Sequence, residues 1–102
     1  MAGMIFLADG RDWSASSSIF YWLLDTLAER AGDTKLADRL REISENNLGS
    51  IDLSSLDDVD VKEFIELAIG APQFAREDLP DTPHRDAIVS LIESLASMFG
   101  EN

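Results

Sequence analysis

The sequence contains no cysteine and only one histidine, His84, among its 102 residues. Disulfide bonds, thiolate metal sites and cysteine nucleophiles are therefore excluded, and the lack of cysteine fits a reducing compartment. Histidine is the most frequent general acid–base side chain. His84 follows Pro83 at a predicted helix start, a position typical of a surface histidine near a helix cap. We therefore expect no enzyme and no cofactor.

The chain also lacks a long hydrophobic run. Residues 4–8 are apolar, but the run is too short for a signal peptide and has no basic lead-in. Residues 19–24 are too few to span a bilayer. We expect no membrane association and a cytoplasmic protein.

Basic residues are scarce: eight lysines and arginines face twenty acids, a net charge of −12. Direct binding to nucleic acid or anionic lipid is disfavoured, because each needs a basic surface. The charge is uneven. Residues 1–51 hold eight acids and five bases (net −3), whereas residues 52–102 hold twelve acids and three bases (net −9). The acidity serves either solubility or attraction to a basic protein.

Apolar residues make up 45% of the chain, enough for the core of a single domain spanning residues 1–102. Helical spacing of apolar residues predicts helices over residues 15–31, from residue 35 on, over 58–70 and over 83–99. Gly32 should end the first helix, Asp33 or Thr34 should cap the second, and Thr82 should cap the last. The expected fold class is mainly α, a compact domain of about four helices, with short strands near residues 4–8 and 50–53.

Local signals also predict the connections and the core. Residues 14–18 offer serine N-caps for the first helix, and Gly70 with Pro72 should end the third, which leaves 71–81 as a loop. The buried residues expected between the last two helices are Phe64, Ile65, Leu91 and Leu95.

Residues 52–66 hold six carboxylates and one base, Lys62. An EF-hand register starting at Asp52 fails, because Leu56 cannot ligate and Asp57 stands where the loop needs glycine. We expect no metal site beyond weak, irregular calcium binding. Carboxylates at residues 57, 58 and 60 complement the dipole of the helix that starts there. Residues 58, 62, 63 and 66 should face water.

Trp22 is placed opposite the apolar face of the first helix, on the stripe with Asp25 and Glu29. Either the N-terminal segment with Trp13 covers it, or it is an exposed binding anchor. The second alternative is chemically attractive because tryptophan is enriched in interface hot spots.

The leading hypothesis is a non-enzymatic acidic interaction module that binds a basic protein surface. Its partner-binding residues would be Asp57, Asp58, Asp60, Glu63, Glu66 and Trp22. In size, charge and helix content the chain is similar to the small acidic four-helix immunity proteins that block basic nuclease toxins, although no motif is shared. The alternatives are a structural or oligomerising small subunit whose acidity serves solubility, and a small enzyme. Homo-oligomerisation is left open.

Overall fold

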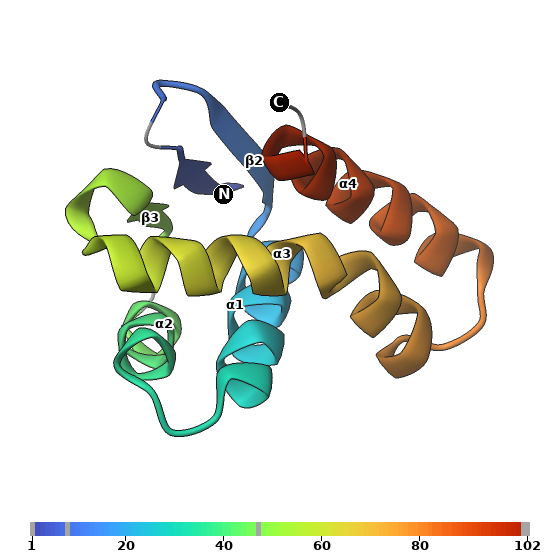
Figure 1. The fold of residues 1–102 in the computed structure, drawn as a ribbon. Helices are drawn as coiled ribbons and strands as arrows, with labels where there is room; N and C mark the ends of the chain where they lie inside the picture. The colour runs from blue at the N-terminus through green and yellow to red at the C-terminus, as the bar shows by residue number, and fades with distance from the viewer. Residues whose placement is uncertain (1, 8, 47, 101–102) are drawn as a thin grey trace.

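Four α-helices and a three-stranded sheet form the part of the chain that the computed structural model describes, residues 2–7, 9–46 and 48–100 (Figure 1). The elements along the chain are β1 (Ala2–Phe6), β2 (Asp12–Ser16), α1 (Ser17–Ala31), α2 (Lys35–Glu45), β3 (Ser50–Asp52), the 3-10 helix η1 (Leu53–Ser55), α3 (Asp58–Asp78) and α4 (Pro83–Gly100). The predicted class, a mainly α domain of about four helices with short strands, is confirmed. Within the described ranges, no helix is long and apolar enough to cross a membrane.

β1 is the middle strand of the sheet. It pairs antiparallel with β2, which places Ile5 opposite Trp13, and parallel with β3, which places Ile5 opposite Ile51. Because side chains alternate between the two faces of a sheet, these three residues point to the same side, and all three are buried. Phe6 belongs to the opposite face and is 37% exposed.

Residues 14–16, predicted as helix N-caps, lie in β2 instead. Trp13 and Ala15 are buried while the polar residues around them are exposed, which is the two-residue period of a strand. α1 consequently begins at Ser17, two residues later than predicted. Ser16 takes the N-cap position without making a side-chain capping bond.

The junction between α1 and α2 follows the sequence signals. α1 ends before Gly32, whose φ of 75° is a conformation that glycine adopts without strain. Its N–H bonds the Ala28 carbonyl at 3.1 Å. The Thr34 hydroxyl caps α2 by accepting the Ala37 N–H at 3.2 Å. The predicted apolar stripe of α2 is buried throughout: Leu36, Leu40 and Ile43.

The third helix is longer than predicted, because α3 continues through Pro72 to Asp78 and shortens the loop expected over residues 71–81 to a short connection after Asp78. Proline removes one helical hydrogen bond and costs about 3 kcal/mol in a helix interior. The apolar period nevertheless continues past it: Phe64, Ala68, Ala71 and Ala75 are fully buried. Burial of this face offsets the local cost. Figure 1 shows α3 changing direction in its last third, as expected at a proline.

α4 begins as predicted, with Thr82 Oγ1 accepting the Arg85 N–H at 3.3 Å and Pro83 as its first residue. It packs along α3, and the Phe64 and Phe99 rings meet edge to face with centroids 6.1 Å apart. Leu95 is fully buried as expected.

Leu91 and Ile65, both predicted in the core, are only half-buried. Leu91 lies at the edge of an arc whose centre is formed by Ile92 and Leu95. Its carbonyl accepts the Trp13 indole N–H at 3.3 Å, so this side of α4 receives β2.

Candidate functional site

The N-terminal end of α3 carries five of the six residues nominated from the sequence. Asp57 is the N-cap, and its Oδ1 accepts the Asp60 N–H at 3.4 Å. Lys35, the first residue of α2, donates to Asp57 Oδ2 at 2.7 Å and lies 3.7 Å from Asp60 Oδ2. This ion pair joins the first turns of α2 and α3.

The two aspartates in this cluster titrate in opposite directions. The hydrogen bond from Lys35 lowers the pKa of Asp57, and the same bond raises the pKa of Lys35. Asp60 is only 8% exposed. Burial raises the pKa of Asp60, and its hydrogen bond with Asp57 and the nearby Asp57 charge raise it further. A proton added to the pair therefore goes first to Asp60.

Glu63 also has a structural contact, although it was expected to face water. It is half-buried, and its Oε1 accepts the Thr34 hydroxyl at 3.1 Å. That hydroxyl is the cap of α2, so Glu63 joins the cap of one helix to the first turns of another. Asp57, Asp60 and Glu63 thus hold α2 against α3.

Asp58 and Glu66 remain free at this end of the molecule. Both are exposed, and no lysine or arginine of the described residues lies within ion-pair distance of either. Val59 follows Asp58 in the first turn of α3, and its exposed fraction of 76% is the highest among the exposed large hydrophobic side chains described. We call this surface the exposed α3 face; its members share one side of the helix at helical spacing: Asp58, Val59, Lys62, Glu66 and Ile69.

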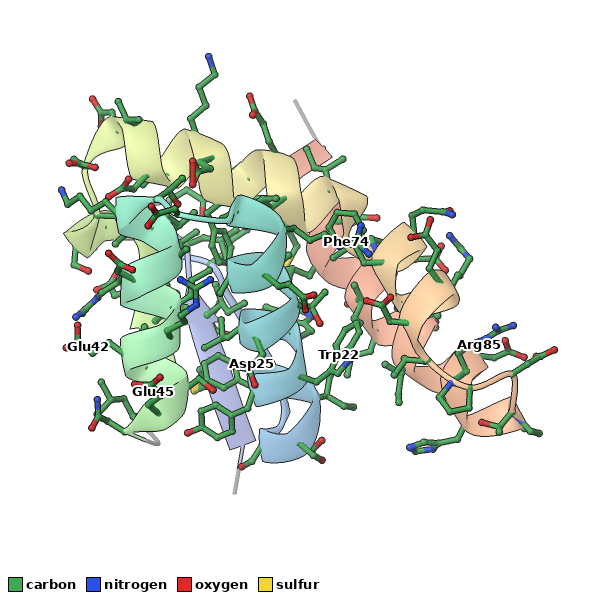
Figure 2. The ribbon with its side chains drawn as sticks, turned by 90° about the horizontal axis from the view of Figure 1, so that it is seen from below. Trp22, Asp25, Glu42, Glu45, Phe74 and Arg85 are labelled. Atoms are coloured by element: carbon green, nitrogen blue, oxygen red, sulfur yellow. The ribbon has the colours of Figure 1, made fainter. Side chains whose placement is uncertain are left out.

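Trp22 lies at the other end of α3. It is half-buried and lines a pocket of about 220 Å³, together with Ser18, Ile19, Leu79, His84 and Ile88. Leu79 is the C-cap of α3. Figure 2 shows Trp22 projecting from α1 toward α3 and α4, on the side away from α2. The structure therefore separates Trp22 from the acidic residues, and we call this second site the Trp22 pocket.

Trp13 is not among the residues that line the Trp22 pocket. Its indole N–H bonds the Leu91 carbonyl and the Ser94 hydroxyl, at 3.3 and 3.2 Å, so it packs on α4. Two alternatives were open for Trp22: cover by the N-terminal segment with Trp13, or an exposed binding anchor. The structure does not show Trp13 covering Trp22. Trp22 is instead half-buried against the core and shares the pocket with Leu79 and His84.

His84 belongs to the Trp22 pocket, although the sequence placed it only near a helix cap. Two pairs four residues apart, Ser18 with Trp22 and His84 with Ile88, were the available signals, since each pair shares a helix face. The described residues show no hydrogen bond between Ser18 and His84; the Ser18 hydroxyl lies 3.5 Å from that of Ser16. Ser18 and His84 therefore do not form a nucleophile–base pair. The lining of the pocket suits the binding of an apolar group.

A second cavity of about 210 Å³ lies between the β1–β2 connection, η1, the N-terminal half of α3 and the end of α4. Half-buried Val61 and Ile65 form part of its wall, which explains why Ile65 is less buried than predicted. At its rim Arg11 pairs with Asp9 at 2.8 Å and donates to the Met98 carbonyl at 2.8 Å. Its polar groups are thus engaged with one another.

Two of the six carboxylates in residues 52–66 cap helices, Asp57 at α3 and Asp52 at η1. Asp52 Oδ1 accepts both the N–H and the hydroxyl of Ser54, at 3.0 and 2.6 Å, and these bonds lower the pKa of Asp52. Across residues 2–7, 9–46 and 48–100, no group of three histidine or acidic side chains is arranged to hold a metal ion.

Comparison with known proteins adds nothing, since no family model, curated protein or solved structure matches the chain.

Proposed function

We propose that the protein is a non-enzymatic acidic interaction module whose exposed α3 face docks onto a basic protein surface. The observation that carries this proposal is Val59, 76% exposed, on the same side of α3 as the unpaired carboxylates of Asp58 and Glu66. Burying an exposed aliphatic side chain contributes to affinity. Unpaired carboxylates around it accelerate encounter with a positive surface.

The other acids at this end have a supporting role in the proposal. Asp57 and Asp60 hold Lys35, and Glu63 holds Thr34, so α2 keeps α3 in place. The docking surface is then presented on a regular helix instead of a loop, which lowers the ordering cost of binding. A basic nuclease, or another protein that itself binds nucleic acid, has the complementary charge, which makes an inhibitor of the immunity type the concrete form of the proposal.

The experiment is capture of partners from the native cell with the immobilised full chain, followed by elution in rising salt and identification of each protein. A basic protein that dissociates as ionic strength rises is the expected result, because a Debye length of about 10 Å at 0.1 M shortens further with salt. Recovery of the chain itself alone would favour the oligomerising subunit. A partner held with the same affinity at every salt concentration would contradict the proposal.

A further inference from the structure

The Trp22 pocket has room for a single side chain. Its volume of about 220 Å³ lies below the range of roughly 300–1,000 Å³ that is usual for pockets holding small-molecule ligands and cofactors. It is open at the surface between α1 and the start of α4, where the exposed His84 stands at its edge. Its size favours an anchor residue of another protein over a free metabolite.

The lining determines which side chain fits. Trp22, Ile19, Leu79 and Ile88 provide an aromatic and aliphatic wall, and no carboxylate lines the pocket. A lysine or arginine head group inside it would lose water without gaining a counter-ion, which is strongly unfavourable. An apolar side chain has no charge to dehydrate on entering, and it gains the contact with Trp22.

The charges beside the pocket determine what flanks that side chain. Asp25 and Glu29 follow Trp22 on the same side of α1, both exposed, with no cation of the described residues in ion-pair distance. Two arginines, Arg30 next to Glu29 and Arg85 next to His84 in the sequence, are already engaged. Arg30 lies 3.5 Å from Glu77, 3.6 Å from Asp78 and 4.2 Å from the centre of the Phe74 ring, and Arg85 pairs with Asp81 at 3.0 Å.

We propose that the Trp22 pocket binds one large apolar side chain, of the size of phenylalanine or leucine, from a lysine- or arginine-rich segment of a protein partner. The apolar side chain inserts between Trp22 and Ile88, and the flanking cations meet Asp25 and Glu29. The basic character of the segment rests on the proposed function, whereas the apolar anchor rests on the pocket alone.

Three synthetic peptides test the anchor and the charge separately. They share one length and differ in composition: lysines around a central phenylalanine, lysines around a central alanine, and glutamates around a central phenylalanine. Each is titrated into the ¹⁵N-labelled full chain while amide and indole N–H shifts are followed by NMR. The lysine–phenylalanine peptide should shift the Trp22 indole and the amides of Ile19, His84 and Ile88 in a saturable manner. Its affinity should exceed that of the alanine peptide about 10- to 100-fold, the value of burying one phenylalanine side chain.

Each further outcome has a defined meaning. Equal affinities of the two lysine peptides, with shifts away from the pocket, would overturn the anchor and leave the proposed function standing. Failure of both lysine peptides at low salt would count against the proposed function as well. Shifts at the pocket that grow with protein concentration alone would assign it to a second copy of the chain and overturn the proposal.

A matched pair of variants completes the test. Trp22→Ala removes part of the pocket wall, and Leu48→Ala removes an exposed aliphatic side chain that lies outside both the pocket and the exposed α3 face. Trp22→Ala should lower the affinity for the lysine–phenylalanine peptide at least tenfold, and Leu48→Ala less than twofold. Equal effects would overturn the proposal. If circular dichroism shows that Trp22→Ala does not fold, the NMR shifts of the unaltered protein decide whether the peptide binds in the Trp22 pocket.

Discussion

The two ends of α3 differ in how they meet solvent. The N-terminal end is polar, with Asp57 and Asp60 tied to Lys35 and with free carboxylates only on the side away from α2. The charged residues of the C-terminal end form ion pairs, Arg76 with Glu93 and both Glu77 and Asp78 with Arg30. Beside them Leu79 lines an apolar pocket with Trp22. A count of acids in the sequence treats all carboxylates alike. The structure shows that a carboxylate beside another helix becomes part of the fold, and only the others can serve a partner.

The comparison assumes that a single hydrophobic core stabilises both ends of α3. Phe64→Ala tests this assumption and has the largest expected effect on stability. Phe64 is fully buried against Phe99, so its truncation should cost about 3–5 kcal/mol of unfolding free energy. Leu91→Ala is the matched control, expected to cost about 1–2 kcal/mol because only half of that side chain leaves water. Urea denaturation measures both. Equal losses would mean that the helices pack differently.

The two tryptophans have different expected roles: Trp13 stabilises the fold, whereas Trp22 is half-buried and lines a pocket where a partner could contact it. Trp13→Phe deletes the indole bonds to the Leu91 carbonyl and the Ser94 hydroxyl, and should cost about 1–2 kcal/mol. Trp22→Phe breaks no hydrogen bond of the described residues and should cost less. Thermal melts of the two variants give the order directly, and a greater loss for Trp22→Phe would show that the Trp22 pocket is structural.

The pH dependence of stability should separate two neighbouring carboxyl groups at the polar end. The pKa of Asp57 is lowered, so its contribution exists above its unfolded pKa and is lost as pH falls through the folded value. The pKa of Asp60 is raised, so its contribution is complete below its unfolded pKa and is lost as pH rises through the folded value.

Asparagine replacements should therefore act in opposite directions at neutral pH. Asp57→Asn keeps the cap but loses the charge, and should lower the unfolding free energy; Asp60→Asn should raise it. Both differences should shrink below about pH 4, where free aspartates protonate. Denaturation at pH 7 and pH 3 measures them. Changes of the same sign at pH 7 would show that the charges of Asp57 and Asp60 do not have opposite effects on the unfolding free energy.

Much of the fold follows from local signals in the sequence. Gly32, Thr34 and Thr82 act within a few residues of themselves, so the helix boundaries that they set were predictable. Two errors arose where distant burial overrode local chemistry. Pro72 and Gly70 should have ended α3, but buried alanines on both sides continue it. The serines after Trp13 predict a helix cap, although the alternation around Ser14 and Ser16 belongs to β2.

The site was less predictable, because its contacts join residues far apart in the chain. Helical spacing correctly exposes Asp58 and Glu66 on α3. It cannot show that Thr34 lies beside Glu63, or that Trp22 and His84 share a pocket. These pairings depend on how α2 and α4 pack around α3, which no local pattern encodes.

The central claim is that the position of the free acids matters, and not only their number. Asp58→Asn with Glu66→Gln removes two charges from the exposed α3 face. Glu42→Gln with Glu45→Gln removes two charges from α2, where Figure 2 labels them and where Glu42 lies 3.5 Å from Arg39. Neither pair should change the unfolding free energy by more than about 0.5 kcal/mol.

Stopped-flow association of each double variant with the captured basic partner, at low and high salt, tests the claim most directly. The α3 pair should slow association severalfold at low salt and flatten its salt dependence, while the α2 pair should have a much smaller effect. Equal slowing by both pairs would contradict the account, because net charge alone would then explain the attraction.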